Sequence, residues 1–257
     1  MSFPISFVGA GPGAPDLLTL RAAERLKHAD LLVWTDSLVC PQIVDLAPQG
    51  CKRIRTSTLT LEQVVPELIS GHRQGKRVVR LHDGDTSLYS AINEQICALN
   101  DADLPVEVIP GISAYQATAA TLNRELTIPG VVQTIVLSRA GGRTGVPETE
   151  ELDRLAALRS SLCLYLSARH VEEVQQKLLN AYPPETPVAI AHRVSWPDEW
   201  ISIVPLHAMA QTTLERKLIR TTLYIVSPAL VEGQQRSKLY SPDHDHLFRP
   251  KQEKPVV

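Results

Sequence analysis

The sequence predicts an α/β protein built from two α/β domains with mixed, largely parallel sheets. Short runs rich in Val, Ile and Leu alternate along the chain with longer segments whose apolar residues recur at helical spacing. A turn with three glycines follows the first of these runs and leads into a helical pattern. Helices that bracket short apolar strands are typical of parallel sheets covered on both faces.

The individual elements follow from the same patterns. Apolar runs predict strands at residues 5–8, 31–34, 76–81, 106–109, 134–137, 162–166, 188–191 and 223–226. Helical periodicity predicts helices at residues 17–28, 61–73, 88–99, 114–122, 150–158, 171–180 and 206–218.

A change in composition at residues 123–130 indicates a domain boundary. We therefore expect an N-terminal α/β domain over residues 1–123 and a C-terminal α/β domain over residues 124–231. Residues 232–257 are rich in Pro, Gln, Lys and Asp, carry no clear period, and predict a loosely packed tail.

Composition excludes several classes of protein. A net charge of −2 and an isoelectric point near 6.4 argue against a general nucleic-acid binder. The chain has no uninterrupted apolar stretch of about 20 residues, and its start lacks the pattern of a signal peptide. The four cysteines are scattered without a C-x-x-C pair, so we expect reduced thiols, no metal site and a cytoplasmic protein.

The first glycine turn, with Gly9, Gly11 and Gly13, is the strongest sign of a ligand site. Glycines let a ligand approach the main chain. Pro15 and Asp16 predict a helix start directly after the turn, and the free amides of a helix start favour negative charge. A tight turn without a ligand is the alternative.

The same turn satisfies the G-x-G-x-x-G/A pattern of dinucleotide-binding proteins, but two features weigh against a nicotinamide cofactor. Pro12 removes an amide that a pyrophosphate would use. The acidic residue expected at the end of the second strand is misplaced, since Asp30 precedes that strand and Asp36 follows it.

Two more strands lead into turns with small or acidic residues, at residues 80–89 and 108–114. Asp85 suits two roles equally well: a cap for a helix that begins near Ser87, or an acceptor for a ligand's hydroxyl or ammonium group. Ser113 suits the N-cap of the helix that follows the Pro-Gly turn. In an open α/β sheet, such turns can converge on one crevice beyond the strand ends.

A fourth loop, residues 137–148, carries Arg139 and Arg143 around two glycines. Two guanidinium groups suit bidentate recognition of carboxylate or phosphate, and a solvated loop with incidental charge is the alternative. Histidines at strand ends, such as His82, read more readily as structural residues than as catalytic ones.

The ordered motifs at residues 8–20, 81–89 and 108–114 resemble those of the tetrapyrrole (corrin/porphyrin) methylase family over essentially the whole chain. Within that family, residues 138–148, 192–199 and 237–250 resemble the members that methylate ring carbon 11 of a precorrin in cobalamin biosynthesis. Asp83 and Thr86 depart from the small residue and the proline that the family often has at those positions.

The resemblance implies S-adenosylmethionine in a cleft between the two domains, S-adenosylhomocysteine as product, a precorrin or cobalt-precorrin substrate, and a homodimer. The positions that match the family's cofactor contacts are Pro12, Asp83, Gly84, Asp85, Leu88, Ser113, Ala114, Leu166, Val194 and Thr222.

The implied chemistry assigns further candidates. The substrate's carboxylates call for basic partners, for which we expect Arg53, Arg55, Arg139 and Arg143. Methyl transfer to a ring carbon also requires that a proton be lost or that the ring charge be stabilised, and the candidates for an acid or base are Asp36, His82 and Asp85, with none singled out. Open alternatives are a sibling acting at another ring carbon, an RNA or protein methylase of the same superfamily, an NAD-linked oxidoreductase, and a non-catalytic carrier.

Overall fold

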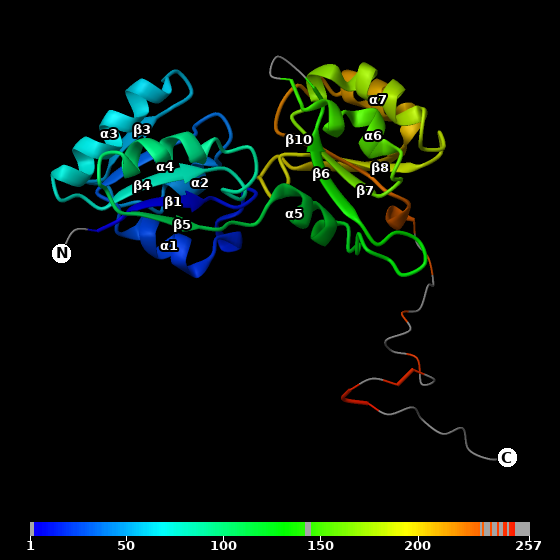
Figure 1. Cartoon of the computed structure of the whole chain (residues 1–257), viewed down its shortest axis with the longest axis horizontal. Coiled ribbons are helices and arrows are strands. Elements are labelled where there is room, and N and C mark those ends of the chain that lie inside the picture. The colour runs from blue at the N-terminus through cyan, green and yellow to red at the C-terminus, as the bar shows by residue number, and fades with distance from the viewer. Residues whose placement is uncertain are drawn as a thin grey trace. The chain divides into compact units, whose positions relative to one another are not determined.

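The computed structural model describes residues 3–141 and 145–231 and, in the last stretch of the chain, Gly233, Ser237, Ser241, His244, Asp245 and residues 247–249. The chain divides into two compact units, each with its own sheet (Figure 1). The first unit comprises residues 1–118 and 191–201, and the second comprises residues 119–190 and 202–257. The predicted domain limits stay a prediction, but the return of residues 191–201 to the first unit is a feature that the sequence analysis does not contain.

The first unit contains a five-stranded sheet in the order β3-β2-β4-β1-β5. Its strands are β1 (Ile5–Gly9), β2 (Leu31–Trp34), β3 (Lys52–Arg55), β4 (Val78–His82) and β5 (Val106–Ile109). Each neighbouring pair is parallel, and β1 lies between β4 and β5, with Val8 opposite both Leu81 and Ile109. The carboxyl ends of β4, β1 and β5 therefore lie side by side.

Helices cover both faces of this sheet because successive residues of each buried strand point to opposite faces. Leu32 and Trp34 pack in the cluster that also holds residues of α1 (Leu20–Lys27) and α2 (Pro41–Val44). Leu31 and Val33 pack in the opposite cluster, beneath α3 (Leu61–Arg73) and α4 (Ile92–Asn100). Figure 1 shows α1 on one side of β1 and α4 on the other.

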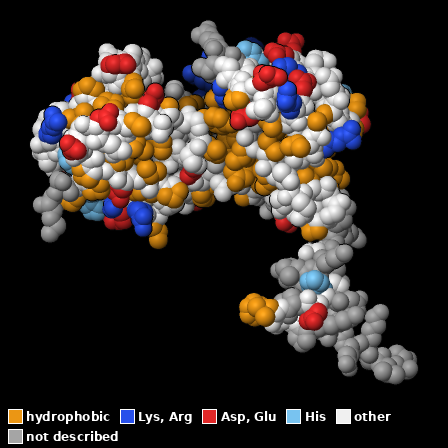
Figure 2. Space-filling view, in the orientation of Figure 1, with side chains coloured by type: hydrophobic (Ala, Val, Ile, Leu, Met, Phe, Trp, Pro, Cys, Tyr) orange, Lys and Arg blue, Asp and Glu red, His pale blue; other side chains and the backbone are white. Residues whose placement is uncertain are grey.

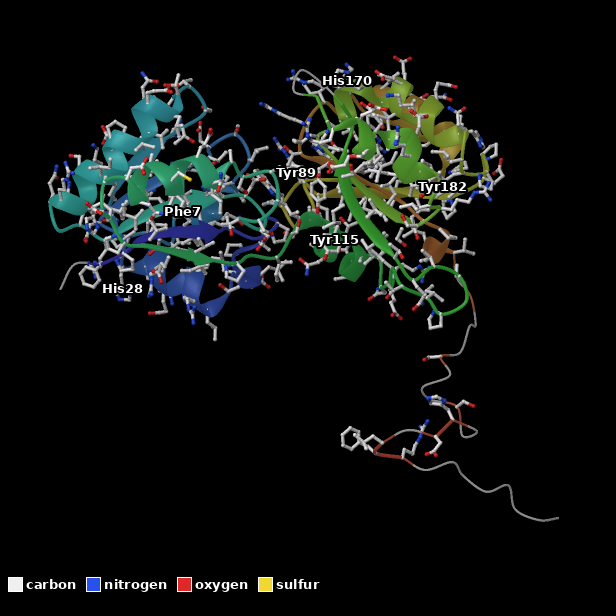
Figure 3. The ribbon with its side chains drawn as sticks, in the orientation of Figure 1. Phe7, His28, Tyr89, Tyr115, His170 and Tyr182 are labelled. Carbon is white, nitrogen blue, oxygen red and sulfur yellow. The ribbon has the colours of Figure 1, made fainter. Side chains whose placement is uncertain are left out.

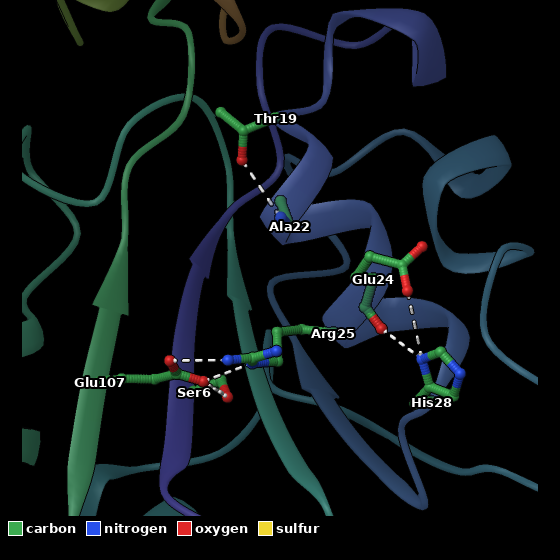
Figure 4. Close-up of polar contacts among 7 residues, drawn as sticks. All are labelled: Ser6, Thr19, Ala22, Glu24, Arg25, His28 and Glu107. Atoms are coloured by element: carbon green, nitrogen blue, oxygen red, sulfur yellow. Dashed lines mark hydrogen bonds and ion pairs between the residues drawn. The ribbon is translucent and has the colours of Figure 1, made fainter.

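A half-buried carboxylate links α1 to the sheet (Figure 4). Glu107 on β5 accepts hydrogen bonds from Ser6 on β1 at 2.6 Å and from the Nε of Arg25 on α1 at 2.5 Å. The hydrogen bond from Arg25 has the largest effect on the pKa of Glu107 and lowers it. Burial raises this pKa, but the bonds from Arg25 and Ser6 outweigh burial and leave the pKa below its ordinary value. Thr19 caps the start of α1 by accepting from the amide of Ala22 at 3.2 Å.

The second unit contains a mixed sheet in the order β6-β7-β10-β8-β9. The strands are β6 (Ile135–Arg139), β7 (Ser161–Tyr165), β8 (Pro187–His192), β9 (Trp200–Pro205) and β10 (Thr222–Val226). The β6–β7 pair is parallel and the β7–β10 pair is antiparallel. The α/β class with largely parallel sheets is thus confirmed.

The helices that follow in the chain are α5 (Ala114–Thr121), α6 (Leu152–Ala156), α7 (Val171–Leu179) and α8 (Met209–Glu215). Acidic and basic side chains intermingle over α6 and α7 (Figure 2). Lys177 on α7 reaches Glu173 at 3.1 Å and Glu151 at 3.8 Å. Single 3-10 turns occur at Pro15–Leu17, Glu148–Glu150, Ala168–His170, Leu206–Ala208 and Pro228–Leu230. No helix among the described residues is long and apolar enough to cross a membrane.

Three elements escape the sequence patterns. Strand β3 reads Lys-Arg-Ile-Arg and lies at a sheet edge with mostly exposed side chains, so it has no apolar run to find. Strand β9 is the edge of the second sheet, and α2 has only four residues. The helix predicted at residues 88–99 begins later, at Ile92.

Candidate cofactor site

Three turns meet at the carboxyl end of the first sheet, after β1, β4 and β5. Gly11 and Gly84 exchange two backbone hydrogen bonds, with N–O distances of 3.1 and 2.9 Å. The amide of Ala10 donates to the carbonyl of His82 at 2.7 Å. The turns after β1 and β4 are therefore one backbone-bonded unit rather than two independent loops.

Close approach of three main chains requires glycine at this point. A Cβ on Gly111 would lie 2.2 Å from the carbonyl oxygen of Gly84 and 3.0 Å from the Cα of Gly9. A Cβ on Gly9 would lie 2.7 Å from the Gly111 amide nitrogen. Real Cβ atoms do not approach backbone this closely, so the absence of side chains at Gly9 and Gly111 lets the three turns come together, and Gly84 adopts a positive φ of 56°.

Asp85 ties the second turn to the third. One carboxylate oxygen accepts from the Gly111 amide at 2.8 Å, and the other accepts from the amide of Ser87 at 2.9 Å and from its hydroxyl. Burial raises the pKa of Asp85, but these hydrogen bonds outweigh it and hold the pKa below its usual range. No helix begins at Ser87, so the suggested helix cap is wrong; the side chain closes a turn instead.

Arg80 is buried at the end of β4, and its charge interacts with that of the half-buried Asp83 in the turn that follows. Arg80 is 6% exposed and donates to the side chain of Gln95 at 3.0 Å and to the carbonyl of Leu81 at 3.3 Å. Burial lowers the pKa of Arg80 to about 10, while the charge of Asp83 acts in the opposite direction. Burial raises the pKa of Asp83, and the Arg80 charge partly offsets this.

His82 is not placed to exchange protons at neutral pH. Its side chain is 2% exposed and stacks on Phe7 of β1, which Figure 3 labels, with ring centroids 6.0 Å apart. Its Nε2 has no hydrogen-bond partner among the described residues. Burial, with a contribution from the Arg80 charge, lowers the pKa of His82 to about 3, so the imidazole is neutral.

Asp36, the remaining acid–base candidate, holds the loop after β3. Its two oxygens accept from the amide of Ser57 at 2.9 Å and from the Ser57 hydroxyl at 2.8 Å. Burial raises its pKa, but the Ser57 bonds prevail and the pKa lies below the ordinary value.

The helix start expected at Pro15 is wrong. Residues Pro15–Leu17 form a single 3-10 turn, and α1 begins only at Leu20, where Thr19 already accepts from the Ala22 amide. The first turn thus does not lead directly into an α-helix N-terminus, and the anion preference inferred from one has no basis here.

The other cofactor candidates of the first unit lie around these turns. Leu88 is half-buried, Ser113 is buried directly before α5, and Ala114 is the first residue of that helix. The amide of Ser113 donates to the Gln116 side chain at 2.9 Å, half of a capping arrangement. Val194 is buried and belongs to the segment 191–201 that returns to this unit.

That returning segment contains the contacts that sequence reasoning missed. The hydroxyl of Ser195 accepts from the amide of Ala14 at 2.9 Å, and the indole Nε1 of Trp196 donates to the carbonyl of Pro12 at 3.0 Å. Nothing in the local pattern of residues 192–199 signals a partner so far away in the chain. The only hint is Gly13, whose missing side chain leaves room for the Trp196 ring.

The candidates in the second unit lie at strand ends. Leu166 directly follows β7 with a positive φ of 53° and is 63% exposed. Thr222 opens β10, is buried, and donates to the carbonyl of Arg220 at 3.1 Å. Arg139 ends β6 and donates to the carbonyl of Gly145 at 2.9 Å. Arg143 lies outside the described residues.

The arginines of β3 belong to the first unit. Arg53 reaches Asp45 at 3.4 Å and donates to the carbonyl of Ala47 at 3.1 Å. The Arg55 guanidinium carbon lies 6.0 Å from the centroid of the Trp34 ring. Both are thus partly held by neighbours on one face of the edge strand. Among the described residues, no group of three or more His, Cys, Asp or Glu side chains could hold a metal ion.

An α/β unit with glycine turns converging beyond neighbouring parallel strands defines a ligand-binding protein of the open-sheet class. The chain belongs to the tetrapyrrole (corrin/porphyrin) methylase family, whose model matches residues 4–210. The family assignment expected from the three motifs is confirmed.

Relatives match over nearly the whole chain. A precorrin-4 C(11)-methyltransferase of Pseudomonas aeruginosa is 40% identical over 96% of this chain and 98% of its own length. A cobalt-precorrin-4 C(11)-methyltransferase of Priestia megaterium is 36% identical over 94% of this chain and 96% of its own.

Solved structures share the fold. The X-ray structure of a cobalt precorrin-4 methyltransferase, a cobalamin biosynthetic enzyme, matches with a TM-score of 0.86 and 34% identity over 89% of this chain and 96% of that one. A uroporphyrin-III C-methyltransferase of Thermus thermophilus, complexed with S-adenosyl homocysteine, matches with a TM-score of 0.75 and 24% identity over 89% of this chain and 99% of that one. At 24% identity, the similarity to the uroporphyrin-III C-methyltransferase shows a shared fold alone.

Proposed function

We propose that this protein transfers the methyl group of S-adenosylmethionine to ring carbon 11 of precorrin-4, or of its cobalt form, and releases S-adenosylhomocysteine. The observation that carries the proposal is identity of 36–40% to proteins of that name over at least 94% of this chain and 96% of theirs. The three joined turns of the first unit support it, because they supply a site for a small ligand where the family's motifs lie.

The residues of these turns fit a nucleoside cofactor. Pro12, Leu88 and Ala114 offer apolar surface, and the carboxylates of Asp83 and Asp85 can accept hydrogen bonds from hydroxyl or ammonium groups. A Cβ on Gly84 would have only the Cα of Ser113 nearby, at 3.9 Å, so the main chain there is open to a ligand. When bound, S-adenosylmethionine supplies a methyl group already activated on its sulfonium.

We infer that the chain contributes mainly by positioning. The protein holds the electron-rich ring carbon in line with the activated methyl group and excludes water. This positioning removes a large part of the activation barrier to methyl transfer. Asp36 and Asp85 are kept ionised by their hydrogen bonds, and their low pKa values make them weak proton acceptors at neutral pH. His82 is neutral but buried and stacked, so we assign it a structural role.

Basic side chains are proposed to hold the substrate's carboxylates, with Arg53, Arg55, Arg139 and Arg143 as the candidates. A guanidinium matches a carboxylate in a bidentate arrangement. Changing Arg139 and Arg143 to Ala together should weaken tetrapyrrole binding and leave S-adenosylhomocysteine binding intact. Unchanged tetrapyrrole affinity would remove this loop from the substrate site.

The cofactor is tested first, because its test avoids the unstable tetrapyrrole. Isothermal titration with S-adenosylhomocysteine should show micromolar binding, and NADH should give no signal. Binding of NADH instead would favour the oxidoreductase alternative. Variants of Leu166 and Thr222, whose assignment stays a prediction, belong in the same titration series.

The reaction is tested with S-adenosylmethionine carrying a ¹³C methyl group. Metal-free and cobalt-containing precorrin-4 are offered separately, and NMR locates the labelled methyl group on the ring. A label at carbon 11 supports the proposal, and the faster substrate identifies the natural form. A label at another ring carbon would make the protein a sibling methylase, and no label with either substrate would favour a carrier.

We further propose that the enzyme works in the cytoplasm as a homodimer without a nucleic-acid substrate. Light scattering on the purified protein measures its mass directly. A monomer in the presence of S-adenosylhomocysteine would refute the dimer, and methylation of RNA added in place of the tetrapyrrole would refute the substrate class.

A further inference from the structure

Residues 193–199 connect β8 to β9 and, together with the adjoining strand residues 191–192 and 200–201, pack with the first unit. Both strands belong to the second sheet, whereas the connection between them contacts residues of the first unit. Ordering residues 193–199, which lie outside any helix or strand, costs conformational entropy. The contacts that the segment makes therefore call for an explanation.

Its contacts concentrate on the first glycine turn. Ser195 accepts from the amide of Ala14 at 2.9 Å, and Trp196 donates to the carbonyl of Pro12 at 3.0 Å. Between these two points, a Cβ on Gly13 would lie 2.2 Å from Cδ1 of the Trp196 ring. Two hydrogen bonds and one ring thus fix three successive residues of the turn.

The segment is itself rigidly held. Arg193 pairs with Asp198 and places its guanidinium carbon 5.1 Å from the centroid of the Trp196 ring. The amide of Ser195 donates to the Glu199 carboxylate at 2.5 Å. Arg193 and Ser195 have positive φ values of 48° and 63°, a conformation that persists only where surrounding contacts impose it. The half-buried Trp196 also packs on the apolar cluster beneath the turn.

We propose that Ser195 and Trp196 are positioning residues that hold the turn from Gly9 to Ala14 in the conformation that binds the cofactor. The inference rests on the proposed function, in which Pro12 contacts S-adenosylmethionine. The turn needs such support from outside, because Gly11 and Gly13 make its backbone flexible and no α-helix follows directly. On its other side, the same turn is held by the Gly11–Gly84 bonds.

The central test replaces Trp196 by Phe, which keeps an aromatic ring and removes the N–H that Pro12 accepts. Loss of one hydrogen bond predicts S-adenosylhomocysteine binding weaker by about three- to tenfold in calorimetry. Ser195→Ala, a smaller change, should weaken binding in the same direction. If Trp196→Phe fails to fold, Ser195→Ala decides the question alone.

Trp34→Phe is the matched control. Trp34 is also an indole packed in the first unit's core, but its Nε1 has no hydrogen-bond partner among the described residues. This control should lose some stability and bind S-adenosylhomocysteine like the wild type. A purely structural role for Trp196 would make both variants less stable with unchanged affinity.

The outcomes separate this inference from the function on which it rests. The positioning role is supported if the wild-type protein binds S-adenosylhomocysteine and both Trp196→Phe and Ser195→Ala bind it more weakly. The positioning role is overturned, and the proposed function stands, if both variants bind S-adenosylhomocysteine as tightly as the wild-type protein. Absence of wild-type binding overturns the cofactor assignment, and the inference with it.

A double-mutant cycle adds a readout independent of the ligand. Gly13→Ala should destabilise the wild type because its new Cβ meets the Trp196 ring, and it should cost less in a Trp196→Ala background. Equal costs in both backgrounds, measured by urea unfolding, would show that the ring does not occupy this position.

Discussion

The glycine at position 111 offers the sharpest test of how the three turns are joined. In Gly111→Ala, the new Cβ would lie 2.2 Å from the carbonyl oxygen of Gly84 and 3.0 Å from both the Cα and the carbonyl carbon of Gly9. All of these are main-chain atoms, so no side chain can rotate away. Relief to an ordinary contact of 3.4 Å or more requires the turns to separate by about an ångström.

Such a separation would affect more than one bond. The Gly111 amide donates to Asp85 at 2.8 Å, and Gly84 carries the reciprocal bonds to Gly11. Overpacking of this kind typically costs about 1–3 kcal/mol. For a chain of this size that corresponds to a fall in Tm of about 2–12 °C.

The assay combines thermal unfolding with calorimetric titration of S-adenosylhomocysteine. Gly50→Ala is the matched control, because a Cβ there meets no atom within 4 Å. We expect Gly111→Ala to lose both stability and affinity while Gly50→Ala keeps both. Wild-type Tm and affinity in Gly111→Ala would refute the close approach of the three turns.

Three further predictions concern the polar groups of the first unit. Glu107→Gln should destabilise the protein by about 1 kcal/mol at pH 7, because it weakens the bonds from Ser6 and Arg25. Since the pKa of Glu107 is lowered in the folded state, the difference in unfolding free energy between the wild type and Glu107→Gln should shrink as pH falls below about 4.5. A difference that does not change with pH in urea unfolding would contradict this prediction. The pKa of His82 falls from 6.5 to about 3 on folding, so the wild type should lose stability as pH falls from 6.5 towards 3. His82→Phe should lose less stability over the same range. Parallel profiles of stability against pH for the two proteins would argue against a buried neutral imidazole. Arg80→Met should cost about 3 kcal/mol, because it leaves the Gln95 side-chain oxygen without the Arg80 donor and removes the bonds from Arg80 to the carbonyls of Val33 and Leu81. Unfolding at the wild-type urea midpoint would exclude this role.

Much of the first unit could be read from local patterns. Strands β2 and β5 and helix α3 begin and end where periodicity predicts, because buried apolar runs and a helical stripe are local signals. Strand β3 could not be found in this way, since an exposed edge strand places no demand on apolar residues. The start of α1 differs from the prediction because Pro15 suits the first position of a 3-10 turn as well as that of an α-helix.

The candidate site also contains some residues that local sequence patterns signal and some contacts that only the tertiary structure brings together. The three glycine motifs are contiguous, so their residues and the family could be recognised from the sequence without coordinates. The sequence does not decide whether Asp85 caps a helix or contacts a ligand, and its bond to Gly111 depends on a residue 26 positions away. His82 looked titratable at a strand end until burial against Phe7 removed it as a base.

Local sequence was therefore enough to establish the fold class, the family and the segments from which the site is built, because strand, turn and helix signals act over a few neighbouring residues. Tertiary structure decided which backbones touch, as in the Gly9–Gly84–Gly111 contact, and which ionisable groups are withdrawn from water. It also decided that Trp196, 184 residues from Pro12 in sequence, supports the first turn. Contacts of that kind depend on how strands are ordered in a sheet and where a returning segment packs, and no local pattern records either.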